Sequence, residues 1–228
     1  MPDFRPYTVR QLDYALDLIE KSIYTAVGQL DIRAWCTREP IPFALRETGA
    51  EKHLAVGDKW GDHFDCAWFH FSGQVPEGAA GRHVVLLLDV NGEMCIVDDH
   101  GVPSQGLTNV SSTFAFQLGK PGKRVLGITQ AAQGGEKISV WADAGCNDLF
   151  GNLQKNGTLE EAVIAICDDE VRALYYDFEV LLDLLKVLPD DSARYQRILT
   201  GLNDVTHLLY QGIPQIAAEA RALLAPLL

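Results

Sequence analysis

Short apolar runs separated by turn residues fill the chain from about residue 31 to residue 142, and they limit the fold more than any other feature. Each run is rich in β-branched and aromatic residues and ends at Gly, Pro, Asn or Asp. The predicted strands are 35–36, 67–74, 83–89, 94–98, 114–117, 123–129 and 137–142. Short strands at this spacing predict an antiparallel sandwich.

The turns between these strands are explicit in the sequence. They read VPEGAAG, DVNGE, DDHG and LGKPGK. Asn91-Gly92 is the strongest hairpin signal, because both residue types accept the positive φ of a tight primed turn. We therefore predict that the strands 83–89 and 94–98 are joined as a hairpin.

Helical periodicity marks both ends of the chain. An opening helix is predicted from apolar residues at steps of three and four, with Gly28 as its stop. These residues are Val9, Leu12, Leu16, Ile19, Ile23 and Val27. After Gly157, the partial alternation of residues 158–167 is compatible with one more strand.

Three further helices are predicted after residue 167. Asp168, Asp169 and Glu170 place negative charge where a helix begins, and an apolar stripe continues over 171–185. Ser192 is the predicted cap of the next helix, and residues 216–227 form a last short one. The leucine-rich ending RALLAPLL led us to expect that the sequence is cut from a longer one.

The predicted fold class is α+β, mainly β: an antiparallel β-sandwich of jelly-roll or galactose-binding-like type, with an N-terminal helix and a C-terminal helical segment. Residues 1–30 are expected to form a helix that packs on the sandwich. Residues 31–167 form the sandwich itself, and 168–228 form a helical linker region.

Composition excludes several classes of partner. A formal charge of −12 without a basic stripe argues against nucleic acid and anionic membranes. The longest apolar run, 84–88, is too short to cross a bilayer, and the first residues lack a secretory signal. Five scattered cysteines without a Cys-x-x-Cys pair indicate reduced thiols, so we expect a cytoplasmic protein.

The strand 67–74 offers the most conspicuous candidate surface. Alternate residues of a strand point to opposite faces, which gives Trp68, His70 and Ser72 one face and Phe69, Phe71 and Gly73 the other. The phenylalanines are expected to face the core, with the tryptophan face exposed or packed under a helix. Tryptophans can stack on sugars, but packing in an ordinary core is the favoured interpretation.

The polar candidates are weaker. Asp58, Asp62, His63 and Asp65 lack the spacing of metal ligands and are interpreted as a solvated loop. Glu93 with Asp98 or Asp99 could form a glycosidase pair, although solvation of a turn is the favoured interpretation. The sequence contains no nucleophile elbow and no phosphate-binding loop, so the residues alone indicate no active site.

Ordered motifs through the middle of the chain carry a family resemblance. They are Trp60-Gly61, 68–76, 81–89, Gly92-Glu93, 100–103 and Gly106-Leu107-Thr108, followed by EVRALYYDFEVLLDLL. Together they resemble the segment before the catalytic domain of family-38 α-mannosidases of the bacterial and vacuolar or cytosolic type. The order Asp99-His100-Gly101 departs from the family's usual Asp-Gly by one interposed residue.

The resemblance implies a catalytic domain after this region, beginning with a His-x-His-x-Asp-x-x-Trp motif. No such motif occurs in the 228 residues, so no catalytic residue and no metal ligand is assigned to this chain. The parent enzyme would hydrolyse terminal α-mannosides with retention, through a divalent metal, usually zinc, in the missing domain. The chain by itself is expected to be inactive and to need no cofactor.

The resemblance also sets the expected partners. The module would pack on its own catalytic domain and contribute to a homo-oligomer interface. Trp60, Trp68, Glu93 and Gln105 are the candidates for a carbohydrate-facing surface, with a mannose-containing oligosaccharide as the ligand. Two alternatives stay open: a free-standing carbohydrate-binding module, and an independent hydrolase that uses Glu93 and an aspartate.

Overall fold

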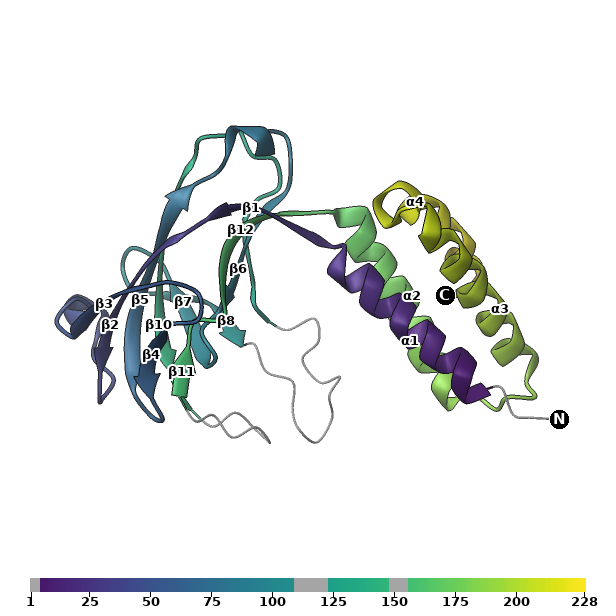
Figure 1. Cartoon of the computed structure of the whole chain (residues 1–228), viewed down its shortest axis with the longest axis horizontal. Helices are drawn as coiled ribbons and strands as arrows, with labels where there is room; N and C mark the ends of the chain where they lie inside the picture. The colour runs from purple at the N-terminus through teal and green to yellow at the C-terminus, as the bar shows by residue number, and fades with distance from the viewer. Residues whose placement is uncertain (1–4, 109–122, 148–155) are drawn as a thin grey trace. The chain divides into compact units, whose positions relative to one another are not determined.

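The computed structural model describes residues 5–108, 123–147 and 156–228. Contacts divide the chain into two compact units, residues 1–25 with 167–228 and residues 26–166 (Figure 1). The first unit is helical and the second consists of β-sheets. The predicted strand 114–117 lies outside the described residues.

A six-stranded antiparallel sheet is the larger layer of the β unit. Its strands follow the order β3 (Ala50–Leu54), β2 (Asp31–Thr37), β5 (Cys66–Gln74), β10 (Lys137–Gly145), β7 (Glu93–Val97) and β8 (Pro103–Thr108). The long strands β5 and β10 pair in register from Lys137 opposite Gln74 to Gly145 opposite Cys66. This pairing fixes which side chains share each face.

The second layer is a four-stranded sheet. Its order is β1 (Tyr24–Gln29), β12 (Glu161–Cys167), β6 (Val84–Asp89) and β9 (Val125–Thr129), and a short pair joins β11 (Asn156–Thr158) to β4 (Lys59–Asp62). Phe69 and Phe71 of the larger sheet and Leu86 and Ile164 of this one belong to one buried apolar cluster. The predicted antiparallel sandwich, with its phenylalanines facing the core, is therefore confirmed.

The predicted hairpin at Asn91-Gly92 is wrong. The strands β6 and β7 on either side of it belong to different sheets, so this turn is a crossover. Asn91 does take a positive φ of 51°, but a Cβ at Gly92 would lie 2.6 Å from the carbonyl oxygen of Gly145. Gly92 is needed for this close approach of two backbones and not for a primed turn.

The helical unit contains four helices among the described residues. They are α1 (Arg5–Lys21), α2 (Asp169–Val187), α3 (Ala193–Leu208) and α4 (Ile213–Leu224). Asp168 caps α2 by accepting a hydrogen bond from the amide of Val171, and Ser192 caps α3 in the same way from Tyr195. Arg221 of α4 pairs with Asp177 and Glu170 of α2, which fixes α4 against that helix.

The opening helix is shorter than predicted. It ends at Lys21, and the predicted stripe residue Val27 lies in strand β1. The β-branched segment after residue 22 gains sheet hydrogen bonds beside β12, which outweighs the helical spacing of its apolar residues. The predicted packing of this helix on the sandwich stays a prediction.

The leucine-rich ending packs within the helical unit. Leu224 and Leu227 are buried, and a Cβ at Gly201 of α3 would lie 2.3 Å from Cδ1 of Leu227. Arg194 donates a hydrogen bond to the carbonyl of Leu227. These leucines therefore have partners inside the chain. No helix in the described ranges is both long and apolar enough to cross a membrane.

Candidate functional site

Trp60 is a core residue. It has 0% exposed surface, its indole N–H donates to the carbonyl of Val90 over 2.7 Å, and its ring meets Phe69 edge-on. A Cβ at Gly157 would lie 2.2 Å from the indole, so only glycine fits opposite this ring. The predicted carbohydrate-facing role of Trp60 is not compatible with this burial, because a sugar has no ring face to reach.

Trp68 lies on the outer face of the six-stranded sheet but is covered. Residues 38–49, named the covering loop from here on, cross this face, and Trp68 is 5% exposed beneath them. Its indole N–H donates to the carbonyl of Ile41 over 2.9 Å, and Phe43 packs edge-on against its ring at 5.4 Å. The covering element is a loop with one 3-10 turn and not a helix, and it leaves Trp68 no stacking surface.

Phe43 attaches the covering loop to the sheet. Its ring packs against Trp141 at 6.4 Å, and the guanidinium of Arg46 lies 4.1 Å from the Phe43 ring centre. Gly101 closes the remaining side: its φ is 80°, and a Cβ there would lie 2.6 Å from Cγ of Phe43. Position 101 therefore requires glycine for two reasons, the close contact with Phe43 and the left-handed backbone conformation.

A groove lies beside the covering loop on the same outer face. It has a volume of about 520 Å³. Its lining residues are Pro40, Cys66, Glu93, Met94, Cys95, Gly106, Leu107, Thr108, Lys123, Asp143, Ala144, Gly145 and Asn147. The strand register explains the floor, since Gly106 of β8 lies opposite Cys95 of β7, which lies opposite Asp143 of β10. Adjacent strands thus place small side chains and one carboxylate in a single row.

Asp143 is the most unusual group in this groove. Its side chain is about half buried, and burial raises the pKa of its carboxyl from the ordinary value of 3.8. Among the residues that the structure describes, none donates a hydrogen bond to it. Burial also raises the pKa of the neighbouring Cys66 thiol, and the Asp143 charge raises it further. The floor of the groove therefore holds an acceptor to which no described residue donates.

Of the four predicted carbohydrate-facing residues, only Glu93 lines the groove. Gln105 pairs with Ile96, which belongs to the buried core, and its amide donates to the carbonyl of Val125 over 2.9 Å. The structure thus does not bring Glu93 and Gln105 together. Sequence reasoning missed Asp143, which directly follows the predicted strand 137–142 and lies within the longer observed strand β10.

The predicted acid pair of Glu93 with Asp98 is not at catalytic spacing, and the pair with Asp99 stays a prediction. Glu93 begins β7 and Asp98 follows its end, so their Cα atoms are about 16 Å apart at about 3.3 Å per strand residue. Glycosidase carboxylates lie about 5–9 Å apart. The Asp98 carboxylate accepts hydrogen bonds from the amides of Val102 and His100, which lowers its pKa and marks it as a turn residue.

The loop with Asp58, Asp62, His63 and Asp65 also has structural roles. The Asp58 carboxylate accepts from the amide of Ala55, and that of Asp65 accepts from the amide of Asp62, both over 2.8 Å. Asp62 pairs with Lys59, which lowers the pKa of its carboxyl. The interpretation as a solvated loop is correct only in part, because Asp62 ends strand β4 and the Asp65 side chain is only 14% exposed.

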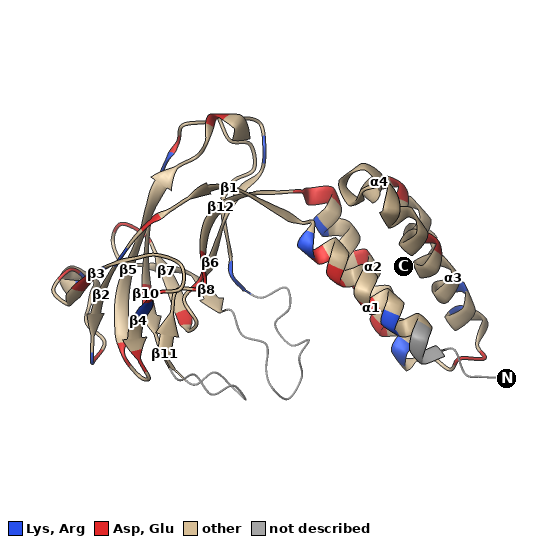
Figure 2. Ribbon diagram, in the orientation of Figure 1, with Lys and Arg blue, Asp and Glu red and all other residues tan. Residues whose placement is uncertain are grey.

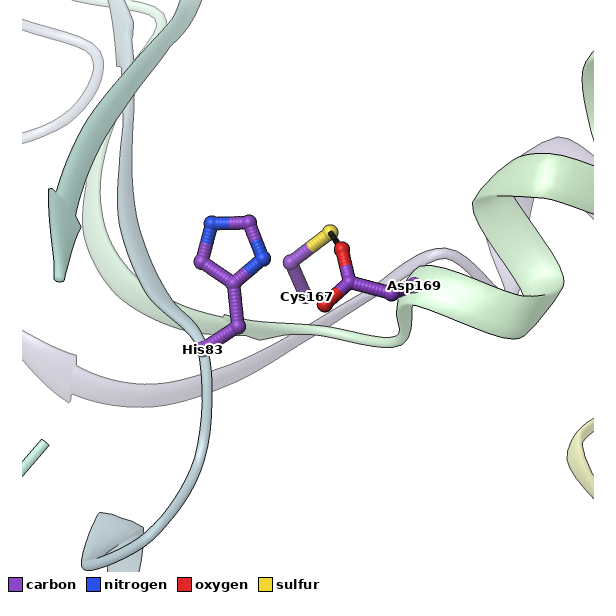
Figure 3. A group of neighbouring side chains, drawn as sticks. All are labelled: His83, Cys167 and Asp169. Carbon is purple, nitrogen blue, oxygen red and sulfur yellow. Dashed lines mark hydrogen bonds between the residues drawn. The ribbon is translucent and has the colours of Figure 1, made fainter. Parts of the chain in front are cut away.

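Cys167 and Asp169 are joined at the start of the helical unit, and Figure 3 shows them with His83. The thiol of Cys167 donates to Oδ1 of Asp169 over 3.9 Å. Burial raises the pKa of this thiol to about 11, so the metal-free thiol is protonated at neutral pH. The His83 ring lies 3.2 Å from the amide nitrogen of Gln130.

Comparisons with known proteins agree on one family. A family model described as "Alpha-mannosidase, jelly roll domain" matches residues 27–170. Alpha-mannosidase 2C1 of Mus musculus is 26% identical over 202 residues, and that of Homo sapiens is 25% identical over 202 residues. Each alignment covers 84% of this chain but only 19% of the relative. The chain therefore spans about a fifth of the length of these relatives.

Proposed function

Because this chain belongs to the family of α-mannosidase jelly roll domains, we propose that it is a non-catalytic module of a longer α-mannosidase. The observation that carries the proposal is the family match over 27–170, which coincides with the β unit of residues 26–166. The tryptophans that suggested a sugar-stacking surface are instead buried in that unit. The rings thus build a scaffold, and we assign the reaction to a catalytic region elsewhere.

The catalytic region would supply the divalent metal and the reacting carboxylates. The carboxylates of this chain support the assignment of the reaction to another region, because Asp58, Asp65 and Asp98 accept backbone hydrogen bonds in turns. We therefore derive no catalytic step from the described residues.

We also propose that the module packs on the catalytic region and contributes to a homo-oligomer. Tyr176, Val180 and Val187 support this, because they leave an apolar row exposed on α2, with 45%, 55% and 78% of their surfaces accessible. Acidic side chains occur on both units, which with the net charge of −12 disfavours nucleic acid as a partner (Figure 2). All five cysteines are free, which supports a reducing, cytoplasmic location.

An activity assay of the purified chain tests the proposal. On an aryl α-mannoside with added zinc, we expect no hydrolysis above that of the metal-containing buffer. Glu93→Gln is the informative variant, because Glu93 belongs to the rival hydrolase hypothesis and lines the groove. Hydrolysis that a chelator removes and that Glu93→Gln abolishes would show that the chain is itself an enzyme.

A further inference from the structure

We propose that the groove beside the covering loop binds a neutral, polyhydroxylated ligand of about the size of one sugar ring. This groove belongs to the 228-residue chain itself, so its ligand binding does not depend on a catalytic region elsewhere. Its volume of about 520 Å³ falls within the range of about 300–1,000 Å³ typical of small-molecule sites.

The lining combines acceptors with donors. The carboxylates of Glu93 and Asp143 accept hydrogen bonds, Lys123 donates them, and Thr108 and Asn147 do both. Hydroxyl groups suit this mixture, because each one donates and accepts. Two carboxylates beside one lysine leave the lining with a net negative charge, which disfavours phosphate and other anions.

Small residues at the floor of the groove leave room for a ligand. A Cβ built on Gly106 would meet no atom within 4 Å, so this glycine opens directly into the groove. Its partner across the strands is Cys95, and Gly145 lies opposite Cys66 and Glu93. Small side chains on neighbouring strands therefore leave room above the sheet that a bulkier residue at Gly106 would fill.

Asp143 favours a ligand that donates a hydrogen bond. A half-buried carboxylate loses hydration, and no described residue offers Asp143 a compensating hydrogen bond, which is unfavourable. A ligand hydroxyl that donates to it would restore the missing bond. The described residues of the lining include no aromatic ring, so hydrogen bonds and not stacking would orient the ligand.

Calorimetry with the full chain tests the proposal. The probes are methyl α-mannopyranoside, putrescine as a small cation and inorganic phosphate. We expect saturable heat with the pyranoside and none with phosphate. The absence of saturable pyranoside binding, or tighter binding of putrescine or phosphate, would overturn the proposal.

Two glycines provide a matched pair of variants. Gly106→Val fills the groove, whereas Gly127→Val adds the same side chain to β9, also with no atom within 4 Å and outside the lining. We expect Gly106→Val to abolish pyranoside binding and Gly127→Val to leave it unchanged. Equal effects of the two variants would overturn the proposal.

The carboxylates provide a second test that does not depend on the bulk of a new side chain. Asp143→Asn and Glu93→Gln keep the size of each residue and remove the charged acceptor. Each is expected to weaken pyranoside binding by about tenfold, the effect of one hydrogen bond to a charged group. Unchanged affinity in both variants would show that the pyranoside binds elsewhere.

Discussion

At the scale of single residues, the tryptophans have structural roles. Trp60 holds the crossover after β6 through the carbonyl of Val90, and Trp68 holds the covering loop through that of Ile41. Trp35 stacks on Trp141 at 5.4 Å on the outer face. The polar tips of Trp60 and Trp68 are thus used inside the chain, while the described residues that line the groove with Asp143 include no aromatic side chain.

Asp143 should make stability depend on pH. Because its folded pKa is raised, the charged form destabilises the native state at pH values above that pKa. Asp143→Asn is therefore expected to raise the free energy of unfolding at pH 7, and the gain should disappear as the pH falls below about 3.8. Urea denaturation at several pH values measures this, with exposed Asp204→Asn as the control. A loss of stability in Asp143→Asn at pH 7 would contradict the assignment.

At the scale of elements, local sequence predicted most strands but not their partners. The runs 67–74 and 137–142 coincide with β5 and β10, because alternation and β-branched residues report a pleated, half-buried surface. The Asn91-Gly92 signal failed because β6 is buried between β12 and β9 and leaves no edge for β7. Glu93 could be identified as a candidate from its Gly-Glu motif. The groove could not be predicted, because it is formed by the register of β8, β7 and β10, and local sequence patterns do not specify that register.

The covering loop should depend on Phe43 more than on its exposed neighbour. Phe43→Ala removes the contacts with Trp68 and Trp141, and we expect a loss of about 1–3 kcal/mol in the free energy of unfolding. Tryptophan emission should shift to the red as water reaches both indoles. Leu45→Ala in the same 3-10 turn is the control, since Leu45 is 49% exposed. Equal losses in the two variants would contradict the role given to Phe43.

At the scale of the whole molecule, the chain combines a family-defining sandwich with a helical unit that has its own buried interior. Ile198, Leu202 and Leu224 are each 0% exposed, so the helical unit has a packed interior. Its role as a linker to a catalytic domain stays a prediction. The sandwich places Phe69 and Phe71 in its core and Trp68 under the covering loop, and it leaves an open groove. The exposed apolar row lies on α2 of the helical unit. These two surfaces are the places where we expect a ligand and a neighbouring region to bind.

Immunoprecipitation from the source organism tests the central claim most directly. An antibody raised against this chain should precipitate α-mannosidase activity that a chelator abolishes, and competition with the purified 25.1 kDa chain should release that activity. The contrary result is a precipitate that contains this chain without α-mannosidase activity, while the α-mannosidase of the extract stays in the supernatant.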